Sequence, residues 1–284
     1  MIMRFVTFFF SGTGNTWWVV KEFTDIASKN GYNAEMFSIE NDQIKNPSIL
    51  SELLEKSDAI GFAYPIYGAN IPPIMREFIT EVKRISDNLN KLDQKYCYII
   101  TTIGYVNGYG PFKIKNTLRS IGLKLKAHIN IRLTNNISTP GLKINPVSSK
   151  KLEKRKKKGT KKLNKFFGKN IKEKKYIRGI GPWLIPGMLI RRRTAPKMKV
   201  SYQRFSINLD TCNNCNICIN NCPSNSIIEV DNKIIFKKGC TACFRCYNFC
   251  PTHSILYNGK FADPGVYHRY LGPIDNLNLK NLKY

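Results

Sequence analysis

The chain is poor in histidine, in acidic residues and in long hydrophobic runs. Its three histidines, His128, His253 and His268, are scattered, and none stands at ligand spacing to another. No Ser/His/Asp arrangement and no paired-carboxylate motif is apparent, so the sequence singles out no catalytic residue. No apolar run approaches the roughly 18 residues that suggest a membrane span. The opening MIMRFVTFFF has no small-residue cleavage site, so we expect a buried strand there and a cytoplasmic protein.

Cysteine is also scarce, except in one short segment. Only Cys97 lies outside residues 212–250, which argues against a disulfide framework spread along the chain. Between residues 207 and 255, eight residues recur at an offset of 28, which indicates two copies of one small unit. The first copy contributes Ile207, Cys212, Cys215, Cys218, Cys222, Pro223, Ser226 and Ile227, and the second contributes Ile235, Cys240, Cys243, Cys246, Cys250, Pro251, Ser254 and Ile255.

Both copies read C-x2-C-x2-C-x3-C-P, the run typical of bacterial ferredoxins with two [4Fe-4S] clusters. Three cysteines on one tight loop can bind three irons of a cubane, but the same loop cannot reach the fourth corner. The fourth cysteine therefore ligates the other cluster. The alternative is zinc, which uses two C-x2-C pairs to build a single tetrahedral site. The run predicts cluster one on Cys212, Cys215, Cys218 and Cys250, and cluster two on Cys240, Cys243, Cys246 and Cys222.

Upstream of residue 146, short apolar runs alternate with amphipathic ones, as in a parallel sheet with crossover helices. This order predicts an α/β fold, a doubly wound, flavodoxin-like parallel sheet of five strands. A small α+β ferredoxin-like domain with two clusters would follow it. The expected strands are 2–10, 33–38, 58–63, 95–102 and 124–131, and the expected helices are 15–29, 48–56, 71–86, 110–121 and 148–171.

The turn SGTGNT after the first expected strand leads directly into an expected helix. Such a turn aims main-chain N–H groups and the positive end of the helix dipole at one point, which favours a phosphate. No lysine follows as in a nucleoside triphosphatase loop, and G-x-G-x-x-G is absent. A small monophosphate therefore fits better than ATP or a dinucleotide, and an ordinary glycine-rich turn is the alternative.

The stretch FSGTGNT resembles the FMN phosphate loop of flavodoxins, and the whole chain is similar to fusions of a flavodoxin with a two-cluster ferredoxin. The resemblance implies that Ser11, Thr13, Gly14, Asn15 and Thr16 bind the FMN phosphate. It also implies two flavin loops, at residues 63–73 and 101–110. In these loops Tyr67 and Tyr105 are the candidates to flank the flavin ring, with Gly68 and Gly104 giving its edge access to the backbone; alternatively, the tyrosines only cover the sheet edge.

The net charge of +27 is concentrated in residues 146–204, which hold 21 of the 46 Lys and Arg residues and 2 of the 19 Asp and Glu residues. Three interpretations remain open for the segment at residues 148–204. It is a solvated helix and linker, or residues 177–193 associate with an anionic membrane surface, or it binds an acidic protein or nucleic acid. Nucleic acid is the least favoured partner, because aromatics do not interleave regularly with the basic residues.

We expect four segments: an FMN-binding domain at 1–175, a basic and apolar linker at 176–202, a ferredoxin-like domain at 203–260 and a tail at 261–284. The expected function is electron transfer between two [4Fe-4S] clusters and FMN, with a ferredoxin or a reductase as partner. The alternative is an FMN and iron–sulfur oxidoreductase that acts on a small molecule such as a quinone or tetrapyrrole. No NAD(P)H fingerprint is visible.

Overall fold

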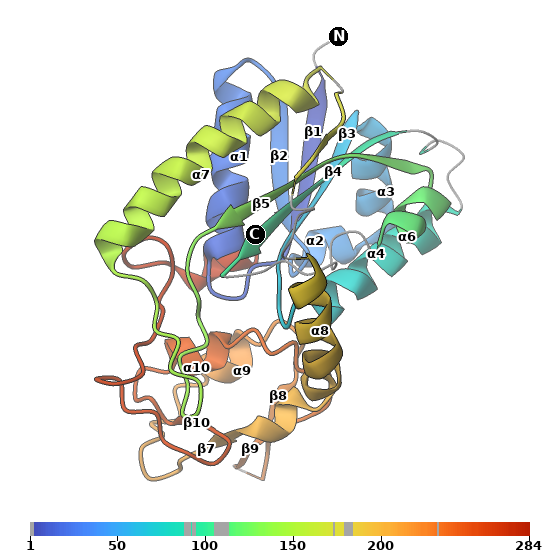
Figure 1. Ribbon diagram of the computed structural model, residues 1–284. Coiled ribbons are helices and arrows are strands. Elements are labelled where there is room, and N and C mark those ends of the chain that lie inside the picture. The colour runs from blue at the N-terminus through green and yellow to red at the C-terminus, as the bar shows by residue number, and fades with distance from the viewer. Residues whose placement is uncertain are drawn as a thin grey trace.

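The fold is known from a computed structural model, which describes residues 3–87, 92, 95–104, 114–172, 174–178, 184–231 and 233–284. Its centre is a six-stranded sheet of order β2-β1-β3-β4-β5-β6, with every neighbouring pair parallel (Figure 1). The order 2-1-3-4-5 is the flavodoxin-like one, extended here by an edge strand. The strands are β1 (Arg4–Phe9), β2 (Asn33–Ser38), β3 (Ala59–Pro65), β4 (Lys95–Ile103), β5 (Leu123–Arg132) and β6 (Tyr176–Ile177).

Helices cover both faces of the sheet, which explains why its strands read as continuous apolar runs. Because side chains alternate along a strand, Phe5 and Phe9 of β1 enter the core on one face, and Phe8 enters the core on the other. The first face is covered by α1 (Asn15–Lys29) and α7 (Ser149–Asn170), the second by α3 (Pro47–Lys56), α4 (Pro73–Ser86) and α6 (Lys115–Ser120); α2 (Asp42–Lys45) precedes α3.

The segment expected to be a linker contains secondary structure that the sequence did not predict. Tyr176 and Ile177 form β6 beside β5, so the sheet has one strand more than the five predicted. Helix α8 (Leu184–Lys199) follows and lies between the sheet and the C-terminal part (Figure 1). Pro186 falls in the first turn of α8, where a missing N–H costs nothing, so the helix can include it.

The C-terminal part, residues 201–284, is built from short elements around the cysteines. They are η1 (Ser201–Arg204), β7 (Phe205–Ile207), α9 (Ile217–Asn220), β8 (Ile227–Val230), β9 (Lys233–Phe236), α10 (Arg245–Phe249), β10 (Ile255–Tyr257) and η2 (Leu279–Leu282). Strand β7 pairs antiparallel with β10, and β8 pairs antiparallel with β9.

The 28-residue repeat is preserved in the backbone. Left-handed conformations recur at this offset in the pairs Asn214 and Ala242, Asn216 and Phe244, and Asn225 and His253. Each copy therefore folds the same way, although alanine and phenylalanine lack the side-chain amide that favours this conformation in asparagine.

The last residues of the chain pack back on the sheet. Tyr270, Leu277 and Leu282 belong to the same core cluster as β1 and α1. Ser38 at the end of β2 donates a hydrogen bond to the Leu282 carbonyl at 2.7 Å. Among the described residues, no helix is long and apolar enough to cross a bilayer.

Candidate cofactor sites

A cavity of about 260 Å³ opens at the carboxyl edge of the sheet, between the sheet and the C-terminal part. The loops after β1, β3, β4 and β5 form one wall, which is where ligands of open α/β sheets bind. Side chains of α8 and of the cysteine segment form the other wall. Gly12 lines it, together with seven of the predicted site residues: Ser11, Thr13, Asn15, Thr16, Tyr67, Gly68 and Gly104.

Residues 11–14, which we call the glycine loop, lead into α1, whose first N–H groups have no main-chain partner in the part of the chain that the structure describes. Gly14 adopts the left-handed conformation with φ of 98°, and its N–H donates to Ser11 Oγ at 3.1 Å. The first main-chain bond of the helix runs from Trp18 N to Gly14 O at 2.9 Å. Within the described residues, the N–H groups of Asn15, Thr16 and Trp17 have no main-chain acceptor. Such unpaired N–H groups at a helix N-terminus favour an anion.

The side chains of the glycine loop and of the first turn of α1 are held in place by the protein itself. Thr16 Oγ1 shares a hydrogen bond with Thr102 Oγ1 at 2.8 Å, and Thr13 Oγ1 accepts from Asn136 Nδ2 at 3.1 Å. The Asn15 amide bridges the Thr134 carbonyl and the Tyr270 hydroxyl. The loop is therefore preorganised.

Gly14 differs from the other predicted phosphate residues because it is not part of the cavity wall. A Cβ at this position would lie 2.6 Å from Leu277 Cδ2 and 2.7 Å from Pro273 Cδ. The C-terminal tail thus covers the outer side of Gly14, which leaves no room for a side chain there.

Of the predicted flavin-contacting residues, Tyr67, Gly68 and Gly104 are at the cavity, and Tyr105 lies outside the described residues. The Tyr67 ring packs edge-on against Phe10, and its hydroxyl lies against Gly12. Burial raises the pKa of Tyr67 well above its usual value, so the phenol stays protonated. Gly68 has φ of 53°, and its carbonyl accepts a hydrogen bond from Thr194 of α8 at 2.7 Å.

Several cavity residues escaped the sequence analysis. The loop after β5 contributes Thr134, Asn135 and Asn136, which could have been found because the carboxyl ends of neighbouring parallel strands meet at one edge. The other missed residues come from α8 and the C-terminal part, and no local pattern marks them. The main ones are Thr194, Lys197, Met198, Arg204, Phe244 and Tyr257.

The eight clustered cysteines surround two smaller hollows, four around each. Among the described residues, no group of three or more His, Cys, Asp or Glu side chains converges closely enough to hold a single metal ion. The structure brings together the same two groups of four that the sequence predicts, so each fourth cysteine comes from the other repeat. The first cysteine group is Cys212, Cys215, Cys218 and Cys250, and the second cysteine group is Cys222, Cys240, Cys243 and Cys246.

Main-chain N–H groups point at the exchanged sulfurs. Ser226 N donates to Cys222 Sγ at 3.2 Å, and Ser254 N donates to Cys250 Sγ at the same distance, again 28 residues apart. Hydrogen bonds of this kind stabilise thiolates and help set the potential of a cluster that they bind. Burial raises the pKa of Cys243 to about 12, so a bound cluster would have to displace its proton.

The two cysteine groups differ in their distance from the cavity. Cys215 of the first group is exposed, whereas Cys243 of the second group is buried against the glycine loop. A Cβ on Gly12 would lie 3.0 Å from both Cβ and O of Cys243. Asn136 ties the two together, because its Nδ2 donates to Cys243 O at 2.9 Å as well as to Thr13. The second cysteine group is thus the one next to the cavity.

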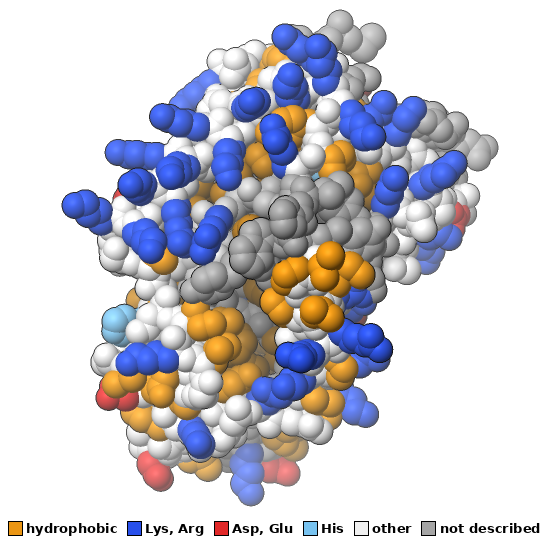
Figure 2. All heavy atoms as spheres, viewed as in Figure 1, with side chains coloured by type: hydrophobic (Ala, Val, Ile, Leu, Met, Phe, Trp, Pro, Cys, Tyr) orange, Lys and Arg blue, Asp and Glu red, His pale blue; other side chains and the backbone are white. Residues whose placement is uncertain are grey.

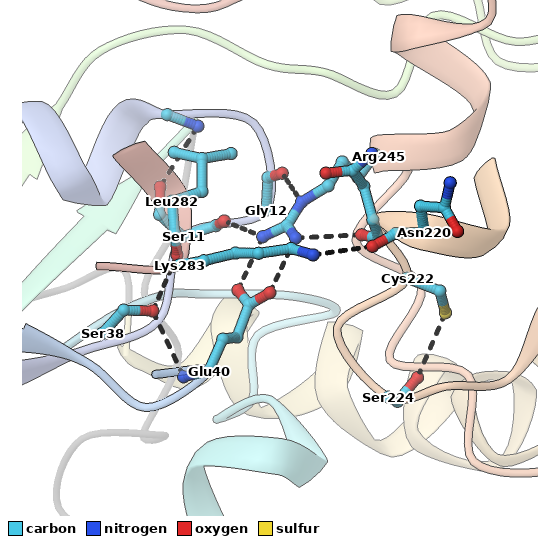
Figure 3. A network of polar contacts seen from close by, with 12 residues as sticks. Ser11, Gly12, Ser38, Glu40, Asn220, Cys222, Ser224, Arg245, Leu282 and Lys283 are labelled. Atoms are coloured by element: carbon cyan, nitrogen blue, oxygen red, sulfur yellow. Dashed lines mark hydrogen bonds and ion pairs between the residues drawn. The ribbon is translucent and has the colours of Figure 1, made fainter. Parts of the chain in front are cut away.

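Arg245, between Cys243 and Cys246, is a further residue that the sequence analysis missed. Its side chain is 1% exposed, and it forms an ion pair with Glu40, whose side chain is 5% exposed (Figure 3). The two carboxylate oxygens accept from Nη2 at 2.6 Å and from Nη1 at 2.7 Å. The guanidinium also donates to the carbonyls of Ser11, Gly12 and Asn221. Arg245 therefore fastens the cysteine segment to the glycine loop.

Known proteins resemble the two parts of the chain separately. Residues 204–260 match the family described as a 4Fe-4S dicluster domain. A search of curated proteins found no significant match to the chain.

Among solved structures, the chain is similar to a flavodoxin from the domain Archaea, with 14% identity over 58% of this chain and 99% of that one and a TM-score of 0.38. It is also similar to a WrbA-like flavodoxin from Agrobacterium tumefaciens, with 15% identity over 61% and 99% of the two chains and a TM-score of 0.42. A third is general stress protein 14 from Treponema denticola in complex with FMN, with 11% identity over 58% and 98% and a TM-score of 0.42. The fold assignment rests on the strand order of the sheet. The chain thus joins a flavodoxin-like α/β fold to a segment that matches the 4Fe-4S dicluster domain family.

Proposed function

We propose that the chain is an electron-transfer iron–sulfur flavoprotein, with FMN in the cavity and a [4Fe-4S] cluster on each cysteine group. The observation that carries the proposal is the contact between the glycine loop and Cys243, where a Gly12 Cβ would lie 3.0 Å from the Cys243 Cβ. A flavin bound at this loop would be next to cluster two. Electrons could then pass between the two groups within one chain, without an encounter between two proteins.

The residues present fit FMN. Unpaired N–H groups at the start of α1 suit its phosphate, and Tyr67 supplies an aromatic ring beside Gly68 at the same cavity. When bound, FMN exchanges one or two electrons and each cluster exchanges one. The protein's part is to hold the three groups in order and to exclude water between them.

The burial of the cysteines favours one order of transfer. The second cysteine group touches the glycine loop, and the first cysteine group carries the exposed Cys215. The sequence of sites is therefore FMN, cluster two, cluster one and then an external partner. Since the far wall of the cavity is formed by the C-terminal part, that part occupies the side from which a soluble partner would otherwise approach the flavin.

The external partner is proposed to be an acidic redox protein, either a ferredoxin or a reductase. Figure 2 shows Lys and Arg side chains gathered over α7, and Glu153 is the single acidic residue of that helix. The apolar side chains of α8, Ile185, Met188 and Leu189, are 68%, 50% and 59% exposed. Association of that helix with an anionic membrane surface is the competing proposal, and binding to vesicles of anionic lipid would favour it.

Anaerobic cofactor analysis of the purified protein tests the proposed function. We expect about eight irons and about one FMN per chain, because each cubane takes four irons and four cysteines. Cys97→Ala is the matched control. Cys97 is buried in β4, away from both cysteine groups, so the iron content of this variant should be unchanged. Zinc in place of iron, or protein without flavin, would contradict the proposal.

A second candidate is an oxidoreductase that acts on a small molecule such as a quinone or tetrapyrrole. It is favoured by two cationic side chains of the cavity wall, Lys197 and Arg204, which could receive an anionic or carbonyl-bearing substrate beside the flavin. Turnover with a soluble quinone in the absence of any carrier protein would support this candidate.

A further inference from the structure

Arg245 connects two segments that are far apart in the chain but adjacent in the fold. It lies inside the second cysteine run, and its donors reach Glu40 after β2 and the carbonyls of Ser11 and Gly12 after β1. Figure 3 shows the guanidinium between the glycine loop and Glu40. Its Nη1 also donates to the carbonyl of Asn221 at 2.9 Å. From within the cysteine segment, Arg245 thus contacts two loops at the edge of the sheet.

The carbonyl contacts constrain the glycine loop in a specific way. In a trans peptide the C=O and the following N–H point in opposite directions. With the carbonyls of Ser11 and Gly12 drawn to Arg245 at 2.7 and 2.9 Å, the N–H groups of Gly12 and Thr13 must point away from it. Gly12 and Thr13 line the cavity, and Arg245 does not. The guanidinium thus sets the direction of two donors at the place where a phosphate is expected.

Glu40 holds the guanidinium in position for this task. It accepts two nearly parallel hydrogen bonds from Arg245, a planar arrangement that lysine cannot reproduce. Glu40 is itself anchored, because its N–H donates to Ser38 Oγ, which in turn donates to the carbonyl of Leu282. The position of the arginine is therefore defined from the sheet side as well as from the cysteine segment.

We propose that Arg245 is a positioning residue for the phosphate of the flavin, supplied to the glycine loop by the iron–sulfur part of the chain. This inference rests on the proposed function, since it takes FMN as the ligand. It adds that flavin binding and the docking of the cysteine segment are linked: whatever stabilises one stabilises the other by the same factor.

Comparing FMN with riboflavin, which lacks the phosphate, isolates this role. The binding of both flavins to cluster-loaded protein, freed of flavin by dialysis, is measured by fluorescence quenching for the wild type and for Arg245→Gln. We expect the preference for FMN over riboflavin to fall by about tenfold or more, the factor that corresponds to about 1.4 kcal/mol, or one hydrogen bond to a charged group. A general loosening of the fold would weaken the binding of both flavins equally and would leave the preference for FMN unchanged. An unchanged preference would therefore overturn the inference.

Arg269→Gln is the matched control. Arg269 is also a partly buried arginine of the C-terminal part, but it stacks over Tyr247 at 3.5 Å and makes no contact with the glycine loop. Its substitution should leave the preference unchanged, and an effect as large as that of Arg245→Gln would contradict a specific role for Arg245.

Glu40→Gln provides the decisive readout if Arg245→Gln loses iron or fails to fold. The amide keeps one acceptor for the guanidinium but removes the second, so the preference for FMN should fall by a smaller factor with iron content intact. A preference equal to that of the wild type would overturn the inference. A wild-type protein that binds neither flavin would instead refute the proposed function itself, together with everything that rests on it.

Discussion

Removing Glu40 tests whether the ion pair with Arg245 holds the two parts of the chain together. In Glu40→Ala the guanidinium keeps its three carbonyl acceptors but loses its only carboxylate, in a site where the arginine side chain is 1% exposed. Breaking a buried pair by removing one partner costs about 3–5 kcal/mol, because a charge remains buried without compensation. We therefore expect the free energy of unfolding to fall by about 3 kcal/mol or more.

An exposed pair of the same length gives the comparison. Lys21 and Asp25 of α1 are 2.7 Å apart, close to the 2.6 Å between Arg245 and Glu40, but their side chains are 52% and 44% exposed. Exposed pairs of this kind contribute about 0.3–0.5 kcal/mol. Asp25→Ala should therefore be close to neutral, and the difference between the two variants reports burial and not distance.

Replacing both partners should not restore stability here. Many buried ion pairs can be exchanged for apolar residues at little cost. In Arg245→Met/Glu40→Ala, however, the carbonyls of Ser11, Gly12 and Asn221 lose their donor, at about 1–3 kcal/mol for each that stays unsatisfied.

Urea unfolding under anaerobic conditions, followed by far-ultraviolet circular dichroism, measures these differences. The reasoning is refuted if Glu40→Ala costs no more than Asp25→Ala, or if the double variant is as stable as the wild type.

Three further predictions follow from the sites. Cys250→Ala should remove the irons of cluster one, and Cys222→Ala should remove those of cluster two, because each of these cysteines ligates the cluster of the other repeat. Iron analysis with electron paramagnetic resonance checks this. Loss of the cluster held by the same repeat would contradict the exchange. Thr13→Val with Thr16→Val should weaken FMN retention, measured by dialysis, while iron content stays constant. Burial lowers the pKa of His128 from 6.5 to about 4, so this histidine takes up a proton in the unfolded chain before it does so in the folded one as the pH falls. The free energy of unfolding, measured by urea titration, should therefore drop by about 1 kcal/mol from pH 7.5 to 5.5. A His128→Gln variant that still shows this drop would refute the assignment.

Sequence analysis identified the candidate cofactor ligands that have a local pattern. The cysteine spacing and its 28-residue repeat predicted which four thiols share a hollow, including the exchange of Cys222 and Cys250 between repeats. Whether those hollows hold clusters, and whether Ser11, Thr13, Asn15 and Thr16 hold a phosphate, stays a prediction. The sequence analysis expected a linker at 176–202 and did not predict α8, whose first turn accommodates Pro186.

The sequence by itself determined the alternation of strands and helices from β1 to β5 and the two cysteine runs, because each depends on spacing between near neighbours in the chain. Only the tertiary structure decided that Glu40 meets Arg245, that the tail covers Gly14, and that the second cysteine group lies against the glycine loop. Those contacts join residues more than 200 positions apart, and they depend on how the sheet edge and the cysteine segment pack. Periodicity and turn chemistry act over a few residues, so they carry no information about contacts between residues so distant in the sequence.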